Sequence, residues 1–158
     1  MAEVLFPPGR FLSDNRHLTV FLAGSIDNGA AEDWQSELFE KLSDVRNVTL
    51  FNPRRKDWDP SWGEDHPELI AQIVWELDHL EQADITVFYF APDSKAPITF
   101  LELGRFGDQD GVVVCCPPGF YRRTNVKVYC DRYQIKMVDS LNDMVKYICD
   151  TAKMVEFP

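Results

Sequence analysis

Two hydrophobic patterns alternate along the chain. Short apolar runs rich in β-branched residues are typical of buried strands, and longer segments with apolar residues every three or four positions are typical of amphipathic helices. Strands are predicted at residues 17–23, 48–51, 85–90, 112–116 and 126–130. Helices are predicted at residues 30–43, 67–82, 97–106 and around 141–148.

This alternation predicts an α/β fold. Successive strands joined by helical crossovers form a parallel sheet with helices on both faces. We therefore expect a three-layer sandwich around a five-stranded, mostly parallel sheet of the flavodoxin-like or Rossmann-like type. A chain of 158 residues fits one domain, so residues 1–158 are assigned to a single domain in which residues 1–16 are an N-terminal extension.

Composition narrows the class of partner. The formal net charge is −10, whereas a nucleic-acid binder needs clustered Lys and Arg to displace counterions from phosphates. No apolar run approaches the ~20 residues of a membrane span. We therefore expect no nucleic acid and no membrane as partners, and a small molecule as substrate.

Four cysteines occur without a CxxC pair or a histidine at zinc-ligand spacing. Neither a metal site nor a disulfide framework is indicated. Reduced thiols in the cytoplasm are the simplest interpretation, and we expect no metal and no cofactor.

A site is expected where the first strand ends. In doubly wound sheets, ligands bind beyond the carboxyl ends of the strands at the topological switch point. This rule makes Gly24 and Ser25 neighbours of residues 91–102. The chain has no GxGxxG, no GxxxxGK[ST] and no GxSxG, so dinucleotide, P-loop and serine-hydrolase functions lose support.

Glu102 is the most informative residue of this region. It lies early in the predicted helix 97–106, among apolar residues. The partial positive charge of a helix N-terminus favours a carboxylate anion, and an ionised carboxylate is the form that acts as a nucleophile. A salt bridge to Arg105 explains the same position equally well.

Glu76 lies beside the apolar stripe of the predicted helix 67–82. Two carboxyl groups in one cleft suit retaining glycosyl chemistry, in which one attacks the anomeric carbon and the other handles the proton of the leaving group. A helix-surface acid is the competing interpretation of Glu76.

Five segments in this order and spacing resemble the nucleoside 2-deoxyribosyltransferase-like family: VFLAGSI from Val20, LFNPRRKDWD from Leu50, QIVWE from Gln72, AD at Ala83, and PITFLELG from Pro97. The resemblance implies transfer of 2-deoxyribose between nucleobases through a covalent intermediate on Glu102. It also implies that Glu76 contacts, and protonates, the base.

The resemblance also implies a homo-oligomer, at least a dimer. Asn125 is similar to a residue that a neighbouring subunit donates to the sugar 5′-hydroxyl. Known members have an acidic residue and a glycine shortly before the nucleophile, whereas this chain has Lys95-Ala96-Pro97. Asp93 or Thr99 is then left to bind the sugar hydroxyls.

The irregular segment 52–66 mixes prolines, charged residues and two tryptophans. We expect it to form the base pocket, with Asn52, Asp57 and Trp62 as contacts, because tryptophan stacks on nucleobases and aspartate accepts from an amine. Both tryptophans could equally be loop packing. Arg54 and Arg55 would suit a phosphate, but pairing with Asp57 or Asp59 is the more ordinary use.

Three functions therefore remain open. The leading one is a nucleoside 2-deoxyribosyltransferase acting on a nucleoside and a free nucleobase. A nucleoside or deoxynucleotide N-glycosidase would keep the nucleophile and use water in the second step. A non-catalytic nucleotide-binding domain would keep only the scaffold.

Overall fold

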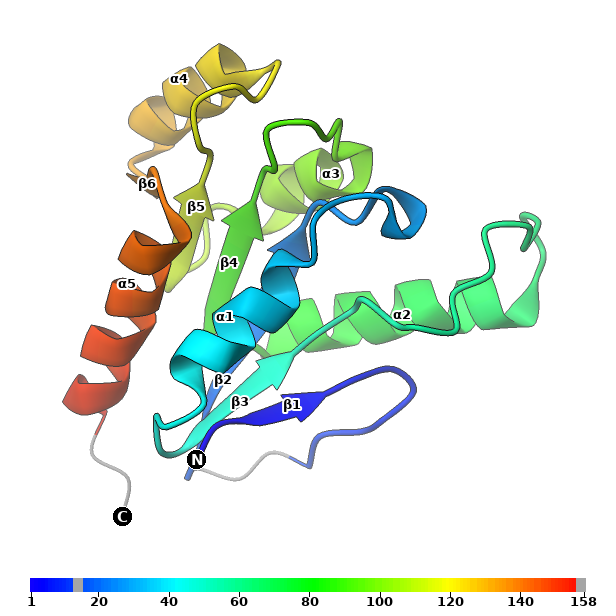
Figure 1. Ribbon diagram of the computed structural model, residues 1–158, viewed down its shortest axis with the longest axis horizontal. Coiled ribbons are helices and arrows are strands. Elements are labelled where there is room, and N and C mark those ends of the chain that lie inside the picture. The colour runs from blue at the N-terminus through cyan, green and yellow to red at the C-terminus, as the bar shows by residue number, and fades with distance from the viewer. Residues whose placement is uncertain (13–15, 156–158) are drawn as a thin grey trace.

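The computed structural model describes residues 1–12 and 16–155 of the chain. Its centre is a six-stranded parallel sheet in the order β1-β3-β2-β4-β5-β6 (Figure 1). The strands are β1 (Glu3–Leu5), β2 (Leu18–Gly24), β3 (Val48–Phe51), β4 (Ile85–Tyr89), β5 (Val112–Cys115) and β6 (Lys136–Val138). The predicted α/β class is confirmed, with six strands in place of five.

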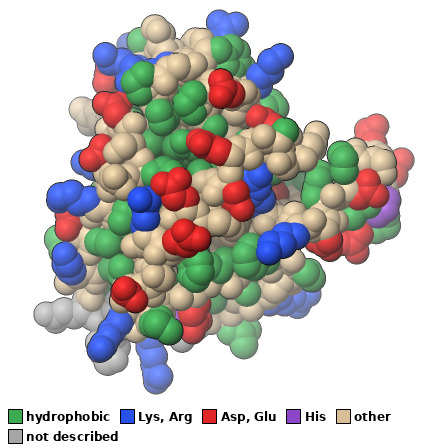
Figure 2. All heavy atoms as spheres, viewed as in Figure 1, with side chains coloured by type: hydrophobic (Ala, Val, Ile, Leu, Met, Phe, Trp, Pro, Cys, Tyr) green, Lys and Arg blue, Asp and Glu red, His purple; other side chains and the backbone are tan. Residues whose placement is uncertain are grey.

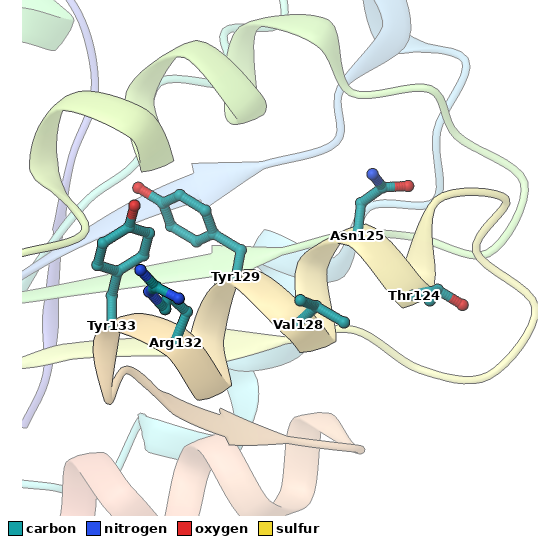
Figure 3. Close-up of a pocket in the computed structure, with 6 residues that line it drawn as sticks. All are labelled: Thr124, Asn125, Val128, Tyr129, Arg132 and Tyr133. Atoms are coloured by element: carbon teal, nitrogen blue, oxygen red, sulfur yellow. The ribbon is translucent and has the colours of Figure 1, made fainter.

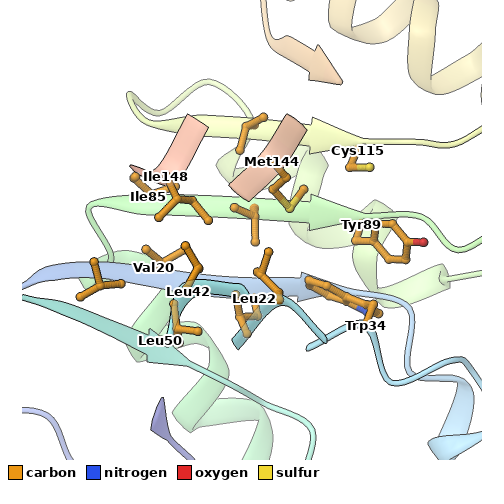
Figure 4. Packing of buried hydrophobic residues seen from close by; sticks show 14 of the residues in the cluster. Val20, Leu22, Trp34, Leu42, Leu50, Ile85, Tyr89, Cys115, Met144 and Ile148 are labelled. Atoms are coloured by element: carbon orange, nitrogen blue, oxygen red, sulfur yellow. The ribbon is translucent and has the colours of Figure 1, made fainter. Parts of the chain in front are cut away.

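Helices cover both faces of the sheet. They are α1 (Trp34–Leu42), α2 (Pro67–Gln82), α3 (Pro97–Phe106), α4 (Arg123–Tyr133) and α5 (Leu141–Met154), with a short 3-10 turn η1 (Asp27–Gly29) after β2. One core lies between the sheet and α1 and α5, as Figure 4 shows for Trp34, Leu42, Met144 and Ile148. The other core lies under α2, α3 and α4.

The central strands are buried on both sides because they serve both cores. Along β2, Val20 and Leu22 belong to the first core, while Phe21 and Ala23 belong to the second. Successive side chains of a strand point to opposite faces. This explains why these strands are continuous apolar runs, as is usual for parallel sheets covered by helices.

The prediction of a strand at residues 126–130 is wrong, because this segment lies in helix α4. Val126 and Cys130 are buried, and Val128 between them is 60% exposed. A spacing of four residues places the two buried side chains on one helix face. The alternation with Lys127 and Tyr129 resembles a strand only because a segment of five residues is too short to distinguish the two-residue period of a strand from the 3.6-residue period of a helix.

Two edge strands have no clear signal in the sequence. β1 lies within the segment predicted to be an N-terminal extension and pairs with β3, and β6 pairs with β5. Each has three residues and is only partly buried. Strands this short do not establish a periodicity.

The segment between β3 and α2 runs out to the N-terminal end of α2, at the right of Figure 1. In the space-filling view its tip stands apart from the body of the protein, and acidic and apolar side chains gather there (Figure 2). Across residues 1–12 and 16–155, no helix combines the length and apolar character needed to cross a membrane.

Candidate active site

The switch point lies between β2 and β4. These two strands pair directly, and Gly24 at the end of β2 is the register partner of Tyr89 at the end of β4. A cleft of about 1080 Å³ opens next to it. The end of β2, the turn η1, residues 53–58, α2 and α3 form its walls.

Glu102 enters this cleft from α3. Leu103 and Phe106 hold the helix in the second core and leave Glu102 at the cleft wall. Its Oε2 atom is buried and has no hydrogen-bond partner within the described ranges. Burial, followed by the charge of Glu76, raises the pKa of Glu102 to about 8.

Glu76 enters the same cleft from α2, where Trp75 and Leu80 hold the helix in the core. Its Oε1 atom accepts a hydrogen bond of 2.8 Å from Gln72 Nε2. Burial raises the pKa of Glu76 to about 7, and the hydrogen bond from Gln72 acts in the opposite direction. Two partly buried carboxyl groups thus lie close enough to repel each other's charge.

The shift at Glu102 is opposite to the effect expected of a helix N-terminus. Glu102 is the sixth residue of α3, and the helix dipole acts mainly within the first turn. Desolvation of a buried carboxylate disfavours its charged form and is the larger effect here.

The salt bridge considered for Glu102 is absent among the described residues. The guanidinium of Arg105 lies over the ring of Phe106, 5.2 Å from its centroid. Among residues 1–12 and 16–155, the carboxyl group of Glu102 therefore has no salt-bridge or hydrogen-bond partner that accounts for its position.

Gly24 lines the cleft, and its lack of a side chain is required by close packing. A Cβ atom there would lie 2.5 Å from the carbonyl oxygen of Tyr89 and 2.6 Å from the ring of Trp34. Ser25 is fully buried, and its hydroxyl accepts a hydrogen bond of 3.0 Å from the amide of Ala91. Ser25 thus ties the end of β2 to the segment after β4, away from the cleft surface.

Two of the residues expected to bind the sugar line the cleft. Thr99 lies in the first turn of α3 and is buried, and Asp93 is exposed in the preceding segment. Between them, Ala96 adopts a left-handed backbone with φ of 47° and directly precedes Pro97, the first residue of the helix.

The residues expected to form the base pocket are not among those that line the cleft. Asn52 is buried and accepts from the amide of Arg54, a local turn contact. Asp57 is exposed and pairs with Arg55 at 2.7 Å. Trp62 packs against Trp58 and stacks on His66.

Trp58 lies on the cleft in place of Trp62. Its indole nitrogen donates to Asn28 Oδ1 at 3.3 Å, and both residues line the cleft. This contact joins the segment after β3 to the turn η1.

Arg54 and Arg55 are held by protein groups. The Arg54 guanidinium donates to the carbonyl oxygens of Gly29, Ala31 and Glu32. Arg55 pairs with Asp57 and Glu68. The pairing expected with Asp57 or Asp59 is confirmed for Arg55, whereas Arg54 binds carbonyl oxygens and pairs with neither aspartate. Neither set of contacts supports a phosphate site.

Asn125 lies away from the cleft. It is exposed at the start of α4 and lines a separate hollow of about 390 Å³ with Thr124, Val128, Tyr129, Arg132 and Tyr133 (Figure 3). Within one chain, Asn125 is therefore absent from the lining of the cleft that holds Glu102.

Several cleft residues were not predicted from the sequence: Asp27, Asn28, Gln72 and Lys95. A signal existed for Gln72, because residues four apart on a helix lie on one face and Gln72 precedes Glu76 by four. Asp27 and Asn28 follow a strand end in a turn-forming AspAsnGly sequence, which marks the turn but gives no sign of its cleft position.

Comparison with known proteins identifies the family of the chain. Residues 17–120 match the model of the family described as nucleoside 2-deoxyribosyltransferase like. The chain belongs to this family. No curated protein matches it.

A solved structure shows the same fold. The crystal structure of a conserved protein from Enterococcus faecalis V583 superposes with a TM-score of 0.59 at 15% sequence identity, covering 85% of this chain and 99% of that chain. At this identity the likeness concerns the fold alone.

The nucleoside 2-deoxyribosyltransferase-like match includes both helices of the cleft and ends before Asn125. Glu76 and Glu102 therefore lie inside the family region. Across residues 1–12 and 16–155, no three His, Cys, Asp or Glu side chains gather in a group that could hold a metal ion.

Proposed function

We propose that this protein is a nucleoside 2-deoxyribosyltransferase that moves 2-deoxyribose between nucleobases with retention of configuration. The observation that carries the proposal is the convergence of Glu76 and Glu102, from two helices, on one cleft of about 1080 Å³. The family assignment supports a nucleoside as the substrate. The carboxyl pair gives the chemistry.

In the first step, a carboxylate oxygen of Glu102 attacks C1′ of the bound nucleoside. The C1′–N bond breaks, its electron pair goes to the departing base, and Glu76 donates a proton to that base. The products are a neutral nucleobase and a 2-deoxyribosyl ester of Glu102. Glu76 is left as a carboxylate.

In the second step, a nitrogen of the incoming base attacks C1′ of the ester. The ester bond breaks and restores the Glu102 carboxylate, while the proton released by the incoming base returns to Glu76. The two attacks on C1′ come from opposite faces, one after the other. Each inverts the configuration at C1′, so the product has the same configuration as the substrate. The pair therefore has to hold one proton when the first step begins, holds none in the ester intermediate, and holds one again when the second step ends.

The raised pKa values fit this requirement. With the pKa of Glu76 at about 7 and that of Glu102 at about 8, the pair holds about one proton near neutral pH. The first step needs that proton on Glu76 and Glu102 as the carboxylate when the substrate is bound. A base nitrogen that accepts a hydrogen bond from protonated Glu76 provides the driving force.

For substrate contacts, we assign the sugar hydroxyls to Thr99 and Asp93. The base is assigned to the indole face of Trp58, the one tryptophan of its segment that lines the cleft. Ser25 and Asn52 then support the walls of the site through their hydrogen bonds to the backbone.

We further propose that the protein acts as a homo-oligomer, at least a dimer. Six large apolar side chains on α2 and α3 are exposed: Ile73, Leu77, Ile98 and Leu101 line the cleft, and Ile70 and Val74 lie on the same helix α2 outside its lining. A contiguous apolar surface of this kind is typical of an interface. A second copy bound there would lie beside the cleft, which the proposed donation of Asn125 requires.

The proposed location is the cytoplasm. All four cysteines carry free thiols, and three of them are buried. Disulfides are rare in reducing compartments, so this state supports the proposal.

The test is a base-exchange reaction. Deoxyinosine is incubated with adenine and the products are separated by chromatography, using the wild type, Glu102→Gln, and Glu81→Gln as a control on the exposed side of α2. We expect deoxyadenosine and hypoxanthine from the wild type and the control, and none from Glu102→Gln.

Other products would decide between the remaining functions. Free 2-deoxyribose formed without adenine would identify an N-glycosidase. Binding of deoxyinosine by calorimetry with no base release would identify a non-catalytic domain. Full exchange by Glu102→Gln would remove Glu102 from the mechanism.

A further inference from the structure

The side chain of Gln72 bridges two parts of the cleft. It lies on α2, one turn before Glu76, and is 3% exposed. Its Nε2 atom donates to the carbonyl oxygen of Pro53 at 2.9 Å and to Glu76 Oε1 at 2.8 Å. One amide group thus contacts both the acid and the segment that follows β3.

The orientation of this amide is fixed by its partners. A carbonyl oxygen and a carboxylate oxygen both accept hydrogen bonds, so the nitrogen of Gln72 must face them. Its Oε1 atom is then buried without a partner in the described part of the chain. An unpaired buried acceptor costs free energy, and an apolar side chain of similar size would avoid this cost.

We propose that Gln72 is a positioning residue, whose amide holds the Glu76 carboxyl group in the cleft and ties it to the main chain at Pro53. The role of Glu76 in this sentence rests on the function proposed above. The contact itself does not depend on that function.

The Pro53 end of this link is itself anchored. The next residue, Arg54, donates to three carbonyl oxygens of residues 29–32. Gln72 therefore connects Glu76 to a continuous chain of contacts that spans the wall of the cleft. A displacement of the 53–58 segment would remove the acceptor at Pro53 and leave Gln72 bound to Glu76 alone.

The hydrogen bond also affects the ionisation of Glu76. A donor to a carboxylate stabilises its charged form, and Gln72 lowers the pKa of Glu76 against the effect of burial. Glu102 faces Glu76 from α3. The other ionisable groups of the cleft are Asp27, Arg54, Arg55, Asp93, Lys95 and Arg105.

The test measures the pKa of Glu76 directly, by NMR titration of the protein labelled with ¹³C in the glutamate carboxyl groups. The Glu76 signal is assigned by its loss in Glu76→Gln. The variant is Gln72→Met, which keeps the volume and removes the donor. The matched control is Gln82→Met, which alters an exposed glutamine at the end of the same helix, outside the cleft lining.

We expect Gln72→Met to raise the pKa of Glu76 by about one pH unit, equivalent to about tenfold in its ionisation constant, because a hydrogen bond to a charged group is lost. Gln82→Met should leave that pKa unchanged. An unchanged pKa in Gln72→Met would overturn the proposal.

Thermal unfolding reports whether each variant folds. If Gln72→Met does not fold, Gln72→Asn replaces it, because its shorter amide cannot span both acceptors. The titration needs no turnover, so a failed base-exchange reaction leaves this result interpretable. Conversely, if the wild type exchanges bases and Gln72→Met leaves the pKa of Glu76 unchanged, only the role of Gln72 is rejected.

Discussion

The buried carboxyl group of Glu102 makes stability depend on pH in a defined direction. Its pKa is about 8 in the folded protein and about 4.3 for an unperturbed glutamate in the unfolded chain. Between these values the folded protein binds more protons than the unfolded chain. Its free energy of unfolding therefore falls as pH rises from about 4.5 to about 8.

The size of the effect follows from the gap between the two pKa values. Each pH unit corresponds to about 1.4 kcal/mol, so Glu102 alone accounts for at most about 5 kcal/mol. Glu102 is partly exposed and its ionisation is coupled to that of Glu76, which both reduce this figure. We expect a net cost of about 1 to 3 kcal/mol at pH 9.

Glu102→Gln tests this argument, because glutamine has nearly the same shape and carries no charge. Urea unfolding of the wild type and the variant, followed by circular dichroism from pH 5 to 9, gives the free energy of unfolding at each pH. The two proteins should be similar at pH 5, and the variant should be more stable at pH 9 by about 1 to 3 kcal/mol. The difference between them cancels the contributions of titrating groups that do not interact with Glu102.

One result would refute the reasoning. If the difference between variant and wild type does not grow between pH 5 and pH 9, Glu102 does not carry a raised pKa. The proposed sharing of one proton between the two carboxyl groups would then be withdrawn.

Three further predictions concern the scaffold and the exposed surface. Gly24→Ala should destabilise the protein by about 1 to 3 kcal/mol because its Cβ would meet the Tyr89 carbonyl and the Trp34 ring; an unchanged thermal midpoint would contradict this. Gln134→Gly should stabilise it by about 0.5 to 1 kcal/mol, since Gln134 ends α4 with φ of 55°; urea unfolding measures the gain. Val74→Asp should convert an oligomer to a monomer in sedimentation velocity, and an unaffected assembly would exclude this face of α2 as the interface.

Helices α2 and α3, and the proximity of the ends of β2 and β4, were predictable from sequence. Regular apolar spacing and a proline at the first helical position define both helices. The crossover rule then places Gly24 beside the end of β4, as the register with Tyr89 confirms. The local apolar spacing and the right-handedness of the crossovers are enough to predict these features, because neither depends on distant contacts.

The lining of the cleft was less predictable. Whether Trp58 or Trp62 faces it depends on a hydrogen bond to Asn28, thirty positions earlier. The ionisation of Glu102 likewise depends on burial under other elements, which outweighs the helix position read from sequence. These properties arise from tertiary contacts between segments that have no common pattern.

Helix α2 contributes side chains to the core, to the cleft and to the exposed surface. Trp75 and Leu80 face the core, Gln72 and Glu76 face the cleft, and Ile70 and Val74 are exposed outside its lining. A mutation at almost any of these positions disturbs more than one property, so the helix is expected to diverge slowly among relatives. New substrate preferences should instead arise in residues 56–65, most of which are exposed and can change without altering the core.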